Sequence, residues 1–511
     1  MRAFWIGIAA GFAFVVVELL GRVVAGVPTV PELIQDRLVL LLPGQVFSFV
    51  LDRLLYLGKP GLFSGLLLVQ AVLGGVGGLV FARWREPIAL GAVIWLATGL
   101  IVLPVAGQGV FANDAGVAFV SLLASGAYVL ALRAYRAAPE SAPAAVTGAS
   151  AEPRRAATGM LPAASRRSLL GGSASFLVSA VLGREIIGTL PTLPPRPDEA
   201  VAAGSPGPAA TPASSATPAL PASVTPADRF YVVSKNLIDP VVDAKSWQLS
   251  VGGLVTHPFS LSYADILAMP SKETYRTLEC ISNEVGGDLI SNGQWVGVGL
   301  ADLLTKAEVS NGATTVHFTS VDGYTDTMAL EKARDPSTLL AYKLNGQPLP
   351  SKHGFPLRVL GTGTYGMKNP KWLTRIDLIT AVTPGFWEGQ GWSSSAIVQT
   401  MARIDAPASG STVQGPIVPI AGIAFAGARG IQRVEVSTDG GKSWAAVQTQ
   451  TPLGANTWTL WTYAWQSPKP GNYNVVVRAV DGTGQVQTPR ETDTFPDGAT
   501  GYESIDIRVN A

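Results

Sequence analysis

The sequence predicts a multi-domain protein in which an all-α transmembrane bundle is followed by an α+β domain and then by an all-β sandwich. Long stretches without a charged residue fill much of the first third of the chain. Residues 227–400 hold more strand-like than helix-like segments, and short strands recur at regular spacing from residue 401. Long stretches without charge are typical of transmembrane helices, a mixture of strands and helices is typical of an α+β domain, and regularly spaced short strands are typical of an all-β sandwich.

The composition supports a membrane part and excludes several classes of function. Hydrophobic residues make up 47% of the chain and charged residues only 14%, which is too apolar for a wholly soluble protein. The formal net charge is +1, so the basic excess typical of nucleic-acid binding is missing. With one cysteine we expect no internal disulfide and no iron–sulfur cluster in this chain. All three histidines lie beyond the apolar region, which excludes a bis-histidine haem within the membrane part.

Residues 1–136 are predicted to form the transmembrane bundle. Three stretches without a charged residue each have about the length that spans a hydrocarbon core: 61–82, 87–112 and 115–132. The range 3–20 is a fourth candidate and contains only Glu18, which is either a functional intramembrane acid or a side chain that reaches the interface. Residues 38–51 are short, so a fifth span, a re-entrant segment and an interfacial helix all remain open.

The basic residues after the bundle predict its orientation. Six arginines gather before and within the connection 137–167: Arg133, Arg136, Arg154, Arg155, Arg166 and Arg167. Such an excess marks cytoplasmic segments. The apolar segment 168–188 that follows is either a last transmembrane anchor with a basic flank or an internal segment that resembles a twin-arginine export signal. Both interpretations anchor a multi-pass protein in the cell membrane, with the later domains on the extracytoplasmic side.

Residues 189–226 are predicted to be an extended linker between the membrane part and the folded domains. The segment is rich in proline, alanine, serine and threonine and has few residues to bury. The α+β domain of residues 227–400 follows. Its expected strands are 247–251, 315–320 and 357–360, and its expected helices are 263–269 and 300–306.

Residues 401–511 are predicted to form an immunoglobulin-like sandwich. The expected strands are 417–425, 432–437, 457–465 and 473–480. The sequence Thr438-Asp439-Gly440-Gly441 is typical of a hairpin turn, with Trp444 expected on the returning strand. Short strands at this spacing favour a two-sheet sandwich.

The only cysteine of the chain, Cys280, stands in a polar, glycine-rich stretch. A lone cysteine is most often a small buried hydrophobic residue. Here Glu279 precedes it, and Asn283, Gly286 and Gly287 follow, a composition typical of a turn. A thiolate on such a turn is also a plausible transition-metal ligand or nucleophile, so these functions stand beside the structural one.

A second stretch, 353–372, is suited to holding an anion. Polar and cationic side chains alternate there with glycines that let backbone N–H groups approach a ligand: His353, Arg358, Gly361, Gly363, Gly366, Lys368, Asn369 and Lys371. No P-loop or GxGxxG motif stands at a strand-to-helix junction, so nucleotide-binding motifs do not account for these residues. Considered one at a time, these residues also have purely structural interpretations. His353 could as well be a turn residue that bonds to the backbone, and Lys368 and Lys371 would more often be solvated surface charges. The whole pattern favours a phosphate-bearing cofactor.

Five motifs in this order resemble the sulfite-oxidase-type molybdopterin oxidoreductases: Leu278-Glu279-Cys280, Trp295-Val296-Gly297, Leu340-Ala341-Tyr342 with Asn345-Gly346, His353-Gly354-Phe355-Pro356-Leu357-Arg358 and Lys371-Trp372-Leu373. The resemblance covers residues 228–400, and a companion domain like that of the family follows. Several ordered motifs are far more specific than any one of them.

The resemblance implies a molybdenum–molybdopterin cofactor. Cys280 is the implied metal ligand, and Tyr342 is similar to a tyrosine near the oxo group that could bind a substrate oxygen, so these two are the implied catalytic residues. Trp295 is similar to a tryptophan that borders the same pocket. The implied contacts to the organic part of the cofactor and its phosphate are Tyr231, Asn283, Ser320, His353, Arg358, Lys368, Asn369 and Lys371.

One departure from the family concerns the substrate. Sulfite-oxidising members place arginines just after the asparagine, where this sequence has Glu284 and Val285. Loss of the cations and gain of an acid weaken the binding of a dianion. Sulfite oxidation and reduction of an S-oxide or N-oxide therefore both remain open for the small-molecule substrate.

The resemblance also leaves the partners open. The chain has no cytochrome b5 signature, so we expect an external electron carrier or redox partner protein, and the family's companion domain commonly forms a homodimer. A competing hypothesis is a membrane-anchored binding or adhesion module that keeps the fold without redox activity. Retention of Cys280, His353, Arg358 and Lys371 favours the enzyme, while the missing arginines keep the alternative open.

Overall fold

The structure is a computed structural model that describes residues 2–34, 58–106, 109–112, 115–136, 221–236, 238–466 and 469–510. The chain divides into two compact units, one built mainly from the N-terminal helices and one mainly from residues 239–511. The predictions for residues 38–51, 137–167 and 168–188 and for most of the linker 189–226 lie outside the described residues.

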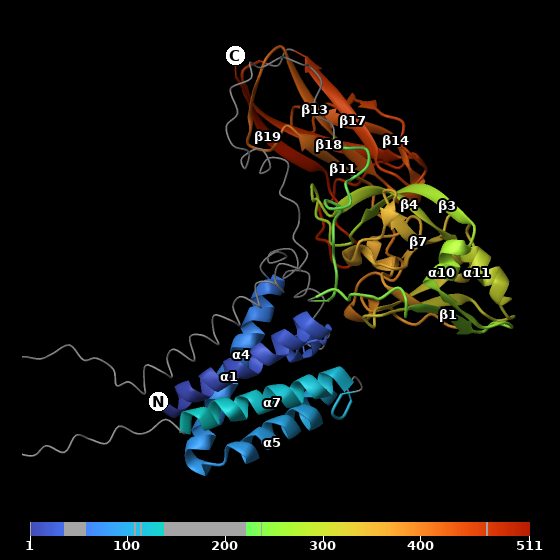
Figure 1. The fold of residues 1–511 in the computed structure, drawn as a ribbon. Coiled ribbons are helices and arrows are strands. Elements are labelled where there is room, and N and C mark those ends of the chain that lie inside the picture. The colour runs from blue at the N-terminus through green and yellow to red at the C-terminus, as the bar shows by residue number, and fades with distance from the viewer. Residues whose placement is uncertain are drawn as a thin grey trace, which may run out of the picture. The chain divides into compact units, whose positions relative to one another are not determined.

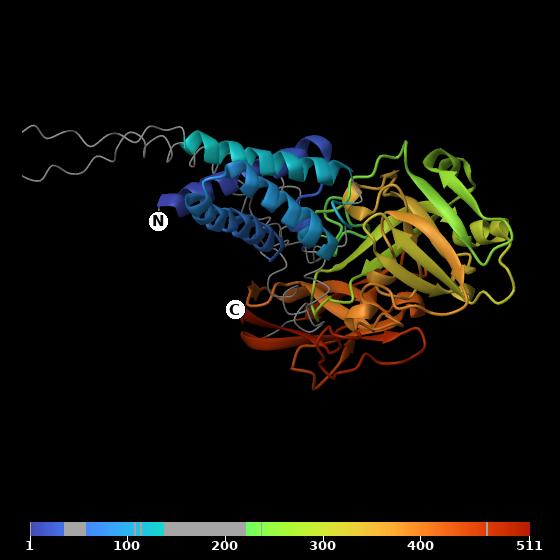
Figure 2. The same cartoon turned by 90° about the horizontal axis from the view of Figure 1, so that it is seen from below.

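The N-terminal unit is a bundle of helices. Its elements are α1 (Arg2–Ala25), α4 (Gly58–Trp84), α5 (Pro87–Ala97), the π-helical turn η1 (Thr98–Val102), α6 (Leu103–Val105) and α7 (Ala115–Arg136). Helix α1 packs against α4 and α7, and α5 packs against α7, as the two views show (Figures 1 and 2). Glycines allow the close contact of α1 with α4, because a Cβ on Gly78 would lie only 2.2 Å from the carbonyl oxygen of Ala3.

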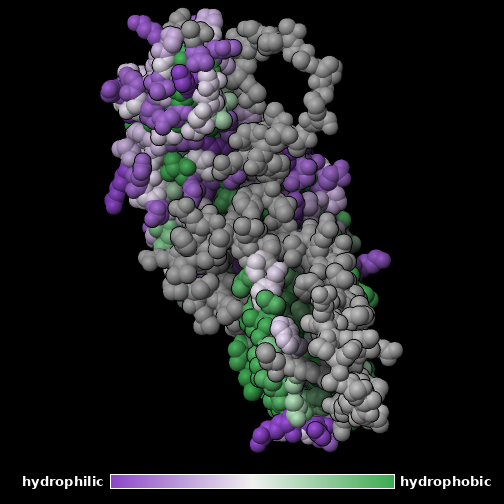
Figure 3. All heavy atoms as spheres, turned by 90° about the vertical axis from the view of Figure 1, so that its left-hand side faces the viewer, coloured by the Kyte–Doolittle hydropathy of each residue, from purple (hydrophilic) through white to green (hydrophobic). Residues whose placement is uncertain are grey.

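Four helices among the described residues are long and apolar enough to cross a membrane, judged by length and composition: Ala3–Ala25, Gly61–Trp84, Pro87–Val105 and Ala115–Ala134. They confirm the predicted apolar helices, although the third ends earlier, before a turn at Gly109 with φ 73°. Hydrophobic side chains dominate the face of the bundle seen in Figure 3. Glu18 is 2% exposed and accepts a hydrogen bond of 3.1 Å from Gln70 Nε2, so its carboxylate lies between α1 and α4.

The strands and helices between Gln248 and Gln390 form an α+β domain with two sheets. The first has the order β2-β1-β10-β5-β6: Phe259–Ser262, Gln248–Gly253, Leu373–Ile379, Thr315–Ser320 and Thr325–Ala329. The second has the order β3-β4-β7-β8, with β9 beside β7: Ser271–Glu279, Ile290–Gly299, Leu339–Leu344, Gln347–Pro348 and Arg358–Leu360. The helices and short turns are α10 (Tyr263–Ala268), α11 (Leu300–Ala307), α12 (Leu330–Ala333), η2 (Ser351–His353), η3 (Gly366–Lys368) and η4 (Glu388–Gln390).

The hydrophobic core of this domain lies between its two sheets. Leu249, Phe318 and Ile376 come from the first sheet, Leu340 comes from the second, and Leu303 of α11 packs against them. These side chains are less than 2% exposed. Because alternate residues of a strand point to opposite faces, the sheets bury one face here, and the polar loops at the strand ends are free for other functions.

The strands between Met401 and Asn510 form a β domain of two sheets around a second core. One sheet has the order β11-β13-β17-β16: Met401–Ala406, Ile417–Phe425, Thr459–Gln466 and Gln448–Thr449. The other has the order β12-β19-β18-β14-β15: Thr412–Gln414, Glu503–Asn510, Gly471–Asp481, Ile431–Ser437 and Ala445–Ala446, with the turn η5 at Gly427–Arg429. Trp461, Val434 and Val477 fill the core between them.

Most predicted elements are confirmed with small shifts at their ends, and the strands at 315–320 and 417–425 have the predicted bounds. One detail is wrong, because Trp444 precedes β15 instead of lying on it. Asp439 Oδ1 accepts hydrogen bonds from the N–H groups of Lys442 (3.1 Å) and Ser443 (2.9 Å), which prolong the turn. Trp444 then packs beneath the guanidinium of Arg478, 4.0 Å from the ring centre.

Truncation of Trp461 to alanine tests the core of the β domain. Trp461 is fully buried, and its indole N–H donates to the carbonyl of Ile423 at 3.1 Å. We expect Trp461→Ala to destabilise this domain by about 3–5 kcal/mol, measured as the shift of its urea unfolding transition. Leu453→Ala is the matched control, because Leu453 is 44% exposed. Equal shifts in both variants would contradict this placement of the core.

Candidate functional site

Cys280 follows directly on β3 and begins the turn that leads to β4. Its N–H donates to the carbonyl of Leu289 at 2.9 Å, which closes the turn just beyond the last strand pair, Glu279 with Ile290. The sulfur lies 3.1 Å from the Ser282 hydroxyl oxygen, and the residue is 9% exposed. The predicted turn is confirmed, and it carries the thiol outside the sheets.

Asn283 holds this turn together. Its Nδ2 donates to Glu279 Oε1, and its Oδ1 accepts from the N–H of Leu289, both at 2.9 Å. The C-terminal domain supports the turn from outside, because Arg403 donates to the carbonyl of Gly287 at 2.7 Å. The side-chain amide of Asn283 is therefore engaged within the loop itself.

Two cations, the buried Arg358 and the half-buried Lys371, lie at the start of β9 and just before β10. Arg358 donates to the carbonyls of His353 (3.2 Å) and Asn369 (3.3 Å), and its guanidinium lies 5.3 Å from the ring centre of Trp295. Lys371 Nζ lies 3.3 Å and 3.2 Å from the carbonyls of Val233 and Lys352. Backbone carbonyls hold both cations in place from several directions.

Neither cation has a counter-ion within ion-pair distance among the described residues. Burial lowers the pKa of Arg358 to about 10 and also lowers the pKa of Lys371. Among the described residues, the buried Nε of Arg358 on β9 and the buried hydroxyl of Ser320 at the end of β5 have no hydrogen-bond partner. A phosphate group would compensate both charges and satisfy both orphaned groups, so these residues fit the phosphate of a molybdopterin cofactor.

Tyr231 and Gly366 connect this cationic region to Cys280. A Cβ on Gly366 would lie 2.5 Å from the hydroxyl of Tyr231 and 3.3 Å from the carbonyl oxygen of Glu279, so only glycine fits between them. Burial, and then the negative charge of a Cys280 thiolate, raise the pKa of Tyr231. The same charge acts on Lys371. Tyr231 therefore lies between the strand end that carries Cys280 and the turn that leads to Lys371, and a single site that includes the sulfur and the cations stays a prediction.

His353 lies in the same region and is bonded to backbone. It is 2% exposed, and its Nε2 lies 3.0 Å from the carbonyl oxygen of Ala227. Phe230 packs edge-on against the imidazole at 5.4 Å between ring centres. Burial, with a further contribution from the positive charge of Arg358, lowers the pKa of His353 to about 3, so the imidazole is neutral at physiological pH.

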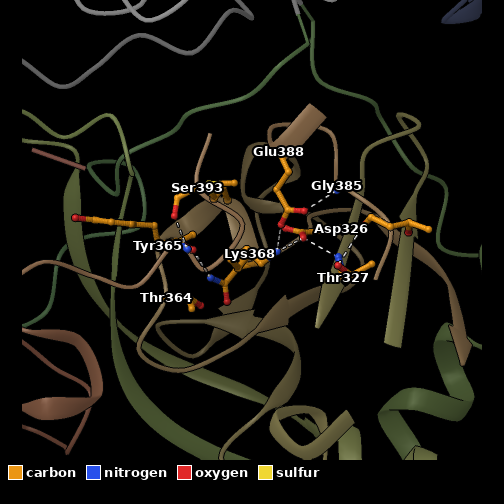
Figure 4. Close-up of polar contacts among 12 residues, drawn as sticks. Asp326, Thr327, Thr364, Tyr365, Lys368, Gly385, Glu388 and Ser393 are labelled. Atoms are coloured by element: carbon orange, nitrogen blue, oxygen red, sulfur yellow. Dashed lines mark hydrogen bonds and ion pairs between the residues drawn. The ribbon is translucent and has the colours of Figure 1, made fainter. Parts of the chain in front are cut away.

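Two predicted cofactor contacts have polar partners inside the protein. Asn369 Oδ1 accepts from the N–H of Gly361 at 2.6 Å, and its Nδ2 donates to the carbonyl of Tyr365 at 3.2 Å. Lys368 Nζ forms ion pairs with Asp326 and Glu388, as Figure 4 shows. The side chains of both residues thus stabilise the loop that carries Lys371.

Tyr342 lies in the core between the two sheets. It is 5% exposed and packs with Trp247 and Leu340, whereas Cys280 lies on the turn beyond β3. In this structure Tyr342 is thus a core residue of β7. Trp295 lies beside Arg358, and its indole N–H donates to the carbonyl of Arg276 at 3.1 Å.

Sequence reasoning missed three residues near the site. Arg276 on β3 is 2% exposed and donates to the carbonyls of Leu360 (2.9 Å) and Gly361 (3.0 Å). Tyr324 donates to the carbonyl of Met367 at 2.7 Å. Trp392 packs in the cluster that includes Ile281, and its buried indole N–H has no acceptor in the described part of the chain. Arg276 offered one signal, a charged residue within a strand, but neither aromatic residue stands in a recognisable motif.

Comparisons with known proteins identify the families of the catalytic and C-terminal domains. The oxidoreductase molybdopterin binding domain family matches residues 236–387, and the Mo-co oxidoreductase dimerisation domain family matches residues 394–494. Sulfite oxidase of Arabidopsis thaliana is 32% identical over 323 residues, which cover 52% of this chain and 82% of that protein. Mitochondrial sulfite oxidase of Homo sapiens is 32% identical over 314 residues, which cover 52% of this chain and only 57% of that protein.

A solved structure shares the fold of the second unit. The sulfane dehydrogenase SoxCD from Paracoccus pantotrophus has a TM-score of 0.51 at 22% identity, and the match covers 57% of this chain and 85% of that chain. The family matches confirm the resemblance that the motifs predicted and the cofactor that it implied. The chain belongs to the sulfite-oxidase-type family of molybdopterin-dependent oxidoreductases.

Proposed function

We propose that this oxidoreductase is anchored in the cell membrane and transfers an oxygen atom to or from a small molecule at an extracytoplasmic site. The observation that carries the proposal is the pair of cations, the buried Arg358 and the half-buried Lys371, which have no ion-pair partner among the described residues. The apolar helices support the membrane anchor, and the arginine-rich connection before residue 168 supports the orientation.

Different residues of the site would bind different parts of the cofactor. Cys280 would bind molybdenum through its thiolate, and Arg358, Lys371 and Ser320 would hold the phosphate. The bound cofactor supplies oxygen-atom transfer coupled to two-electron redox chemistry. Neutral His353 adds no further charge, and Gly366 lets Tyr231 approach the cysteine turn. Because this site is buried, water is excluded from the charged contacts, which strengthens them.

We also propose that the electrons are exchanged with a separate redox carrier and that the protein is a homodimer. The family of the C-terminal domain supports the dimer. The strand order β11-β13-β17-β16 opposite β12-β19-β18-β14-β15 supports an immunoglobulin-like sandwich for this domain.

The charges around the cysteine turn favour a neutral oxide over a sulfite dianion as substrate. Glu284 and Val285 are both exposed on the turn, where sulfite-oxidising relatives are expected to carry arginines. Arg403 reaches the turn, but its guanidinium is already paired with Asp405 at 2.7 Å. Without a free cation on the turn, an S-oxide or N-oxide would be bound with less loss of solvation energy than a dianion.

Replacement of the cysteine tests the proposed function directly. The purified wild-type protein should contain stoichiometric molybdenum, and Cys280→Ser should contain almost none, because a neutral hydroxyl replaces the thiolate ligand. Metal analysis by mass spectrometry measures both. Asp288→Asn changes an exposed residue of the same turn and should retain the metal. Wild-type protein without molybdenum would instead favour the non-redox binding module.

Substitution of Lys371 tests the phosphate contact. A charge-assisted hydrogen bond contributes about 1.5–3 kcal/mol, so Lys371→Met should weaken cofactor retention roughly 10- to 150-fold. The pterin released from purified protein can be quantified by its fluorescence after oxidation. The cofactor-free variant should unfold at about the same temperature as cofactor-free wild type, because the half-buried ammonium that is removed has no ion-pair partner among the described residues. Lys352→Met is the control, because it removes a half-buried lysine of η2 whose Nζ donates to the carbonyl of Asp228 at 3.3 Å, and equal pterin loss there would rule out the specific contact.

The substrate preference can be reversed by one substitution. Val285→Arg restores a cation on the turn and should raise the rate of reduction of the protein by sulfite by about tenfold, since one charge-assisted contact is gained. The wild-type protein, once reduced, should be reoxidised by a sulfoxide faster than the oxidised protein is reduced by sulfite. Absorbance changes in stopped flow measure both rates, with Val285→Leu as control. Fast reduction of the wild type by sulfite would contradict the proposed preference.

A further inference from the structure

Lys368 is buried between two carboxylates. Its Nζ lies 2.5 Å from Asp326 Oδ1 and also pairs with Glu388 Oε1 (Figure 4). The side chains of Lys368, Asp326 and Glu388 are only 9%, 2% and 5% exposed. They come from η3, β6 and η4, so the cluster joins three segments that are separate in the sequence.

Both carboxylates are fixed independently of the lysine. Asp326 Oδ1 accepts from the N–H of Thr327 at 2.6 Å, and Glu388 Oε2 accepts from the N–H of Gly385 at 3.0 Å. The burial of Lys368 acts to lower its pKa, but the two carboxylates outweigh this effect and raise it. The ammonium is therefore charged and held in a preformed anionic site.

The turn η3 ends at Lys368 and leads directly into residues 369–372, which we call the cofactor loop. Asn369 follows, its carbonyl accepts from Arg358 at 3.3 Å, and Lys371 stands two residues further on. Tyr324 holds the preceding carbonyl, that of Met367, at 2.7 Å. A shift of Lys368 would therefore move the groups that face the phosphate.

The cluster also ties this loop to the connector between the catalytic and C-terminal domains. Glu388 lies in that connector, residues 380–400. Further along it, the N–H of Tyr365 donates to the carbonyl of Ala396 at 2.8 Å, and the N–H of Val398 donates to the carbonyl of Gly363 at 3.2 Å. The ion pair of Lys368 with Glu388 and the backbone hydrogen bonds of Gly363 and Tyr365 therefore attach residues 363–368 to the connector at several points.

We propose that Lys368, Asp326 and Glu388 form a positioning cluster that sets the cofactor loop, so that Lys368 acts on the cofactor through Asn369 and Lys371 rather than by touching its phosphate. The inference rests on the proposed function, in which the chain holds molybdopterin. The competing view is the direct cofactor contact that the sequence predicted for Lys368.

Removal of the charge of Lys368, or of the charges of Asp326 and Glu388, distinguishes the positioning role from direct contact with the phosphate. In the full-length protein, Lys368→Met and the double variant Asp326→Asn/Glu388→Gln should each lower the molybdenum and pterin content by about tenfold, as is usual for groups that orient a metal site from outside. The triple variant should lose no more than either, because all the substitutions break one interaction. Lys368→Arg should recover part of the content.

The acid variant is decisive, because it frees the ammonium of Lys368. Wild-type or higher cofactor content in Asp326→Asn/Glu388→Gln, with loss in Lys368→Met, would overturn the proposal in favour of direct contact. In the remaining loaded protein, the Mo(V) electron paramagnetic resonance of Lys368→Arg should be shifted from that of the wild type. An unchanged spectrum with merely lower yield of folded protein would also overturn it, since that result indicates a general structural role.

A matched control guards against unrelated effects. Lys343→Met changes a half-buried lysine of β7 that forms no ion pair among the residues described here, and it should keep wild-type cofactor content. Wild-type protein that lacks molybdenum would contradict the proposed function itself. Wild-type content in both the control and Lys368→Met would contradict only the positioning role.

Discussion

The catalytic domain depends on one constraint: the buried Arg358 and the half-buried Lys371 have no ion-pair partner among the described residues. A charge moved out of water loses solvation energy, and backbone carbonyls and the rings of Trp295 and Trp372 return part of it. Such an arrangement is stable when an anion completes it. Much of the surrounding structure, including the glycine at 366 and the neutral state of His353, can be understood as making room for that anion without adding more charge.

The turn that carries Cys280 is held in place by a different part of the chain from the one that carries the two cations. Cys280 stands where β3 ends, so the sheet fixes its backbone while the turn leaves the sulfur outside the core. Asn283 closes the turn from within, and Arg403 of the C-terminal domain supports it from outside. The C-terminal domain thus contributes to the geometry of the proposed metal ligand as well as to the proposed dimer.

A matching motif does not establish what a side chain does. Asn369 and Lys368 stand in the expected order, yet the structure commits their polar groups to the loop and to Asp326 and Glu388. Tyr342 stands in a matching motif as well and belongs to the core cluster of its domain, so its contact with a substrate stays a prediction. The resemblance fixes where a residue lies along the chain, whereas its role depends on partners that come from distant segments.

The sequence by itself determined the order of the domains, the apolar helices, most strands, the cysteine turn and the cofactor family, because periodicity, charge-free length and ordered motifs are local properties. It could not reveal Arg276 beneath the loop, the carboxylates around Lys368 or the orphaned groups of Arg358 and Ser320. These features depend on which side chains meet when strands far apart in the chain pair. Only the tertiary structure decides that, since burial and hydrogen-bond satisfaction are properties of the packed molecule.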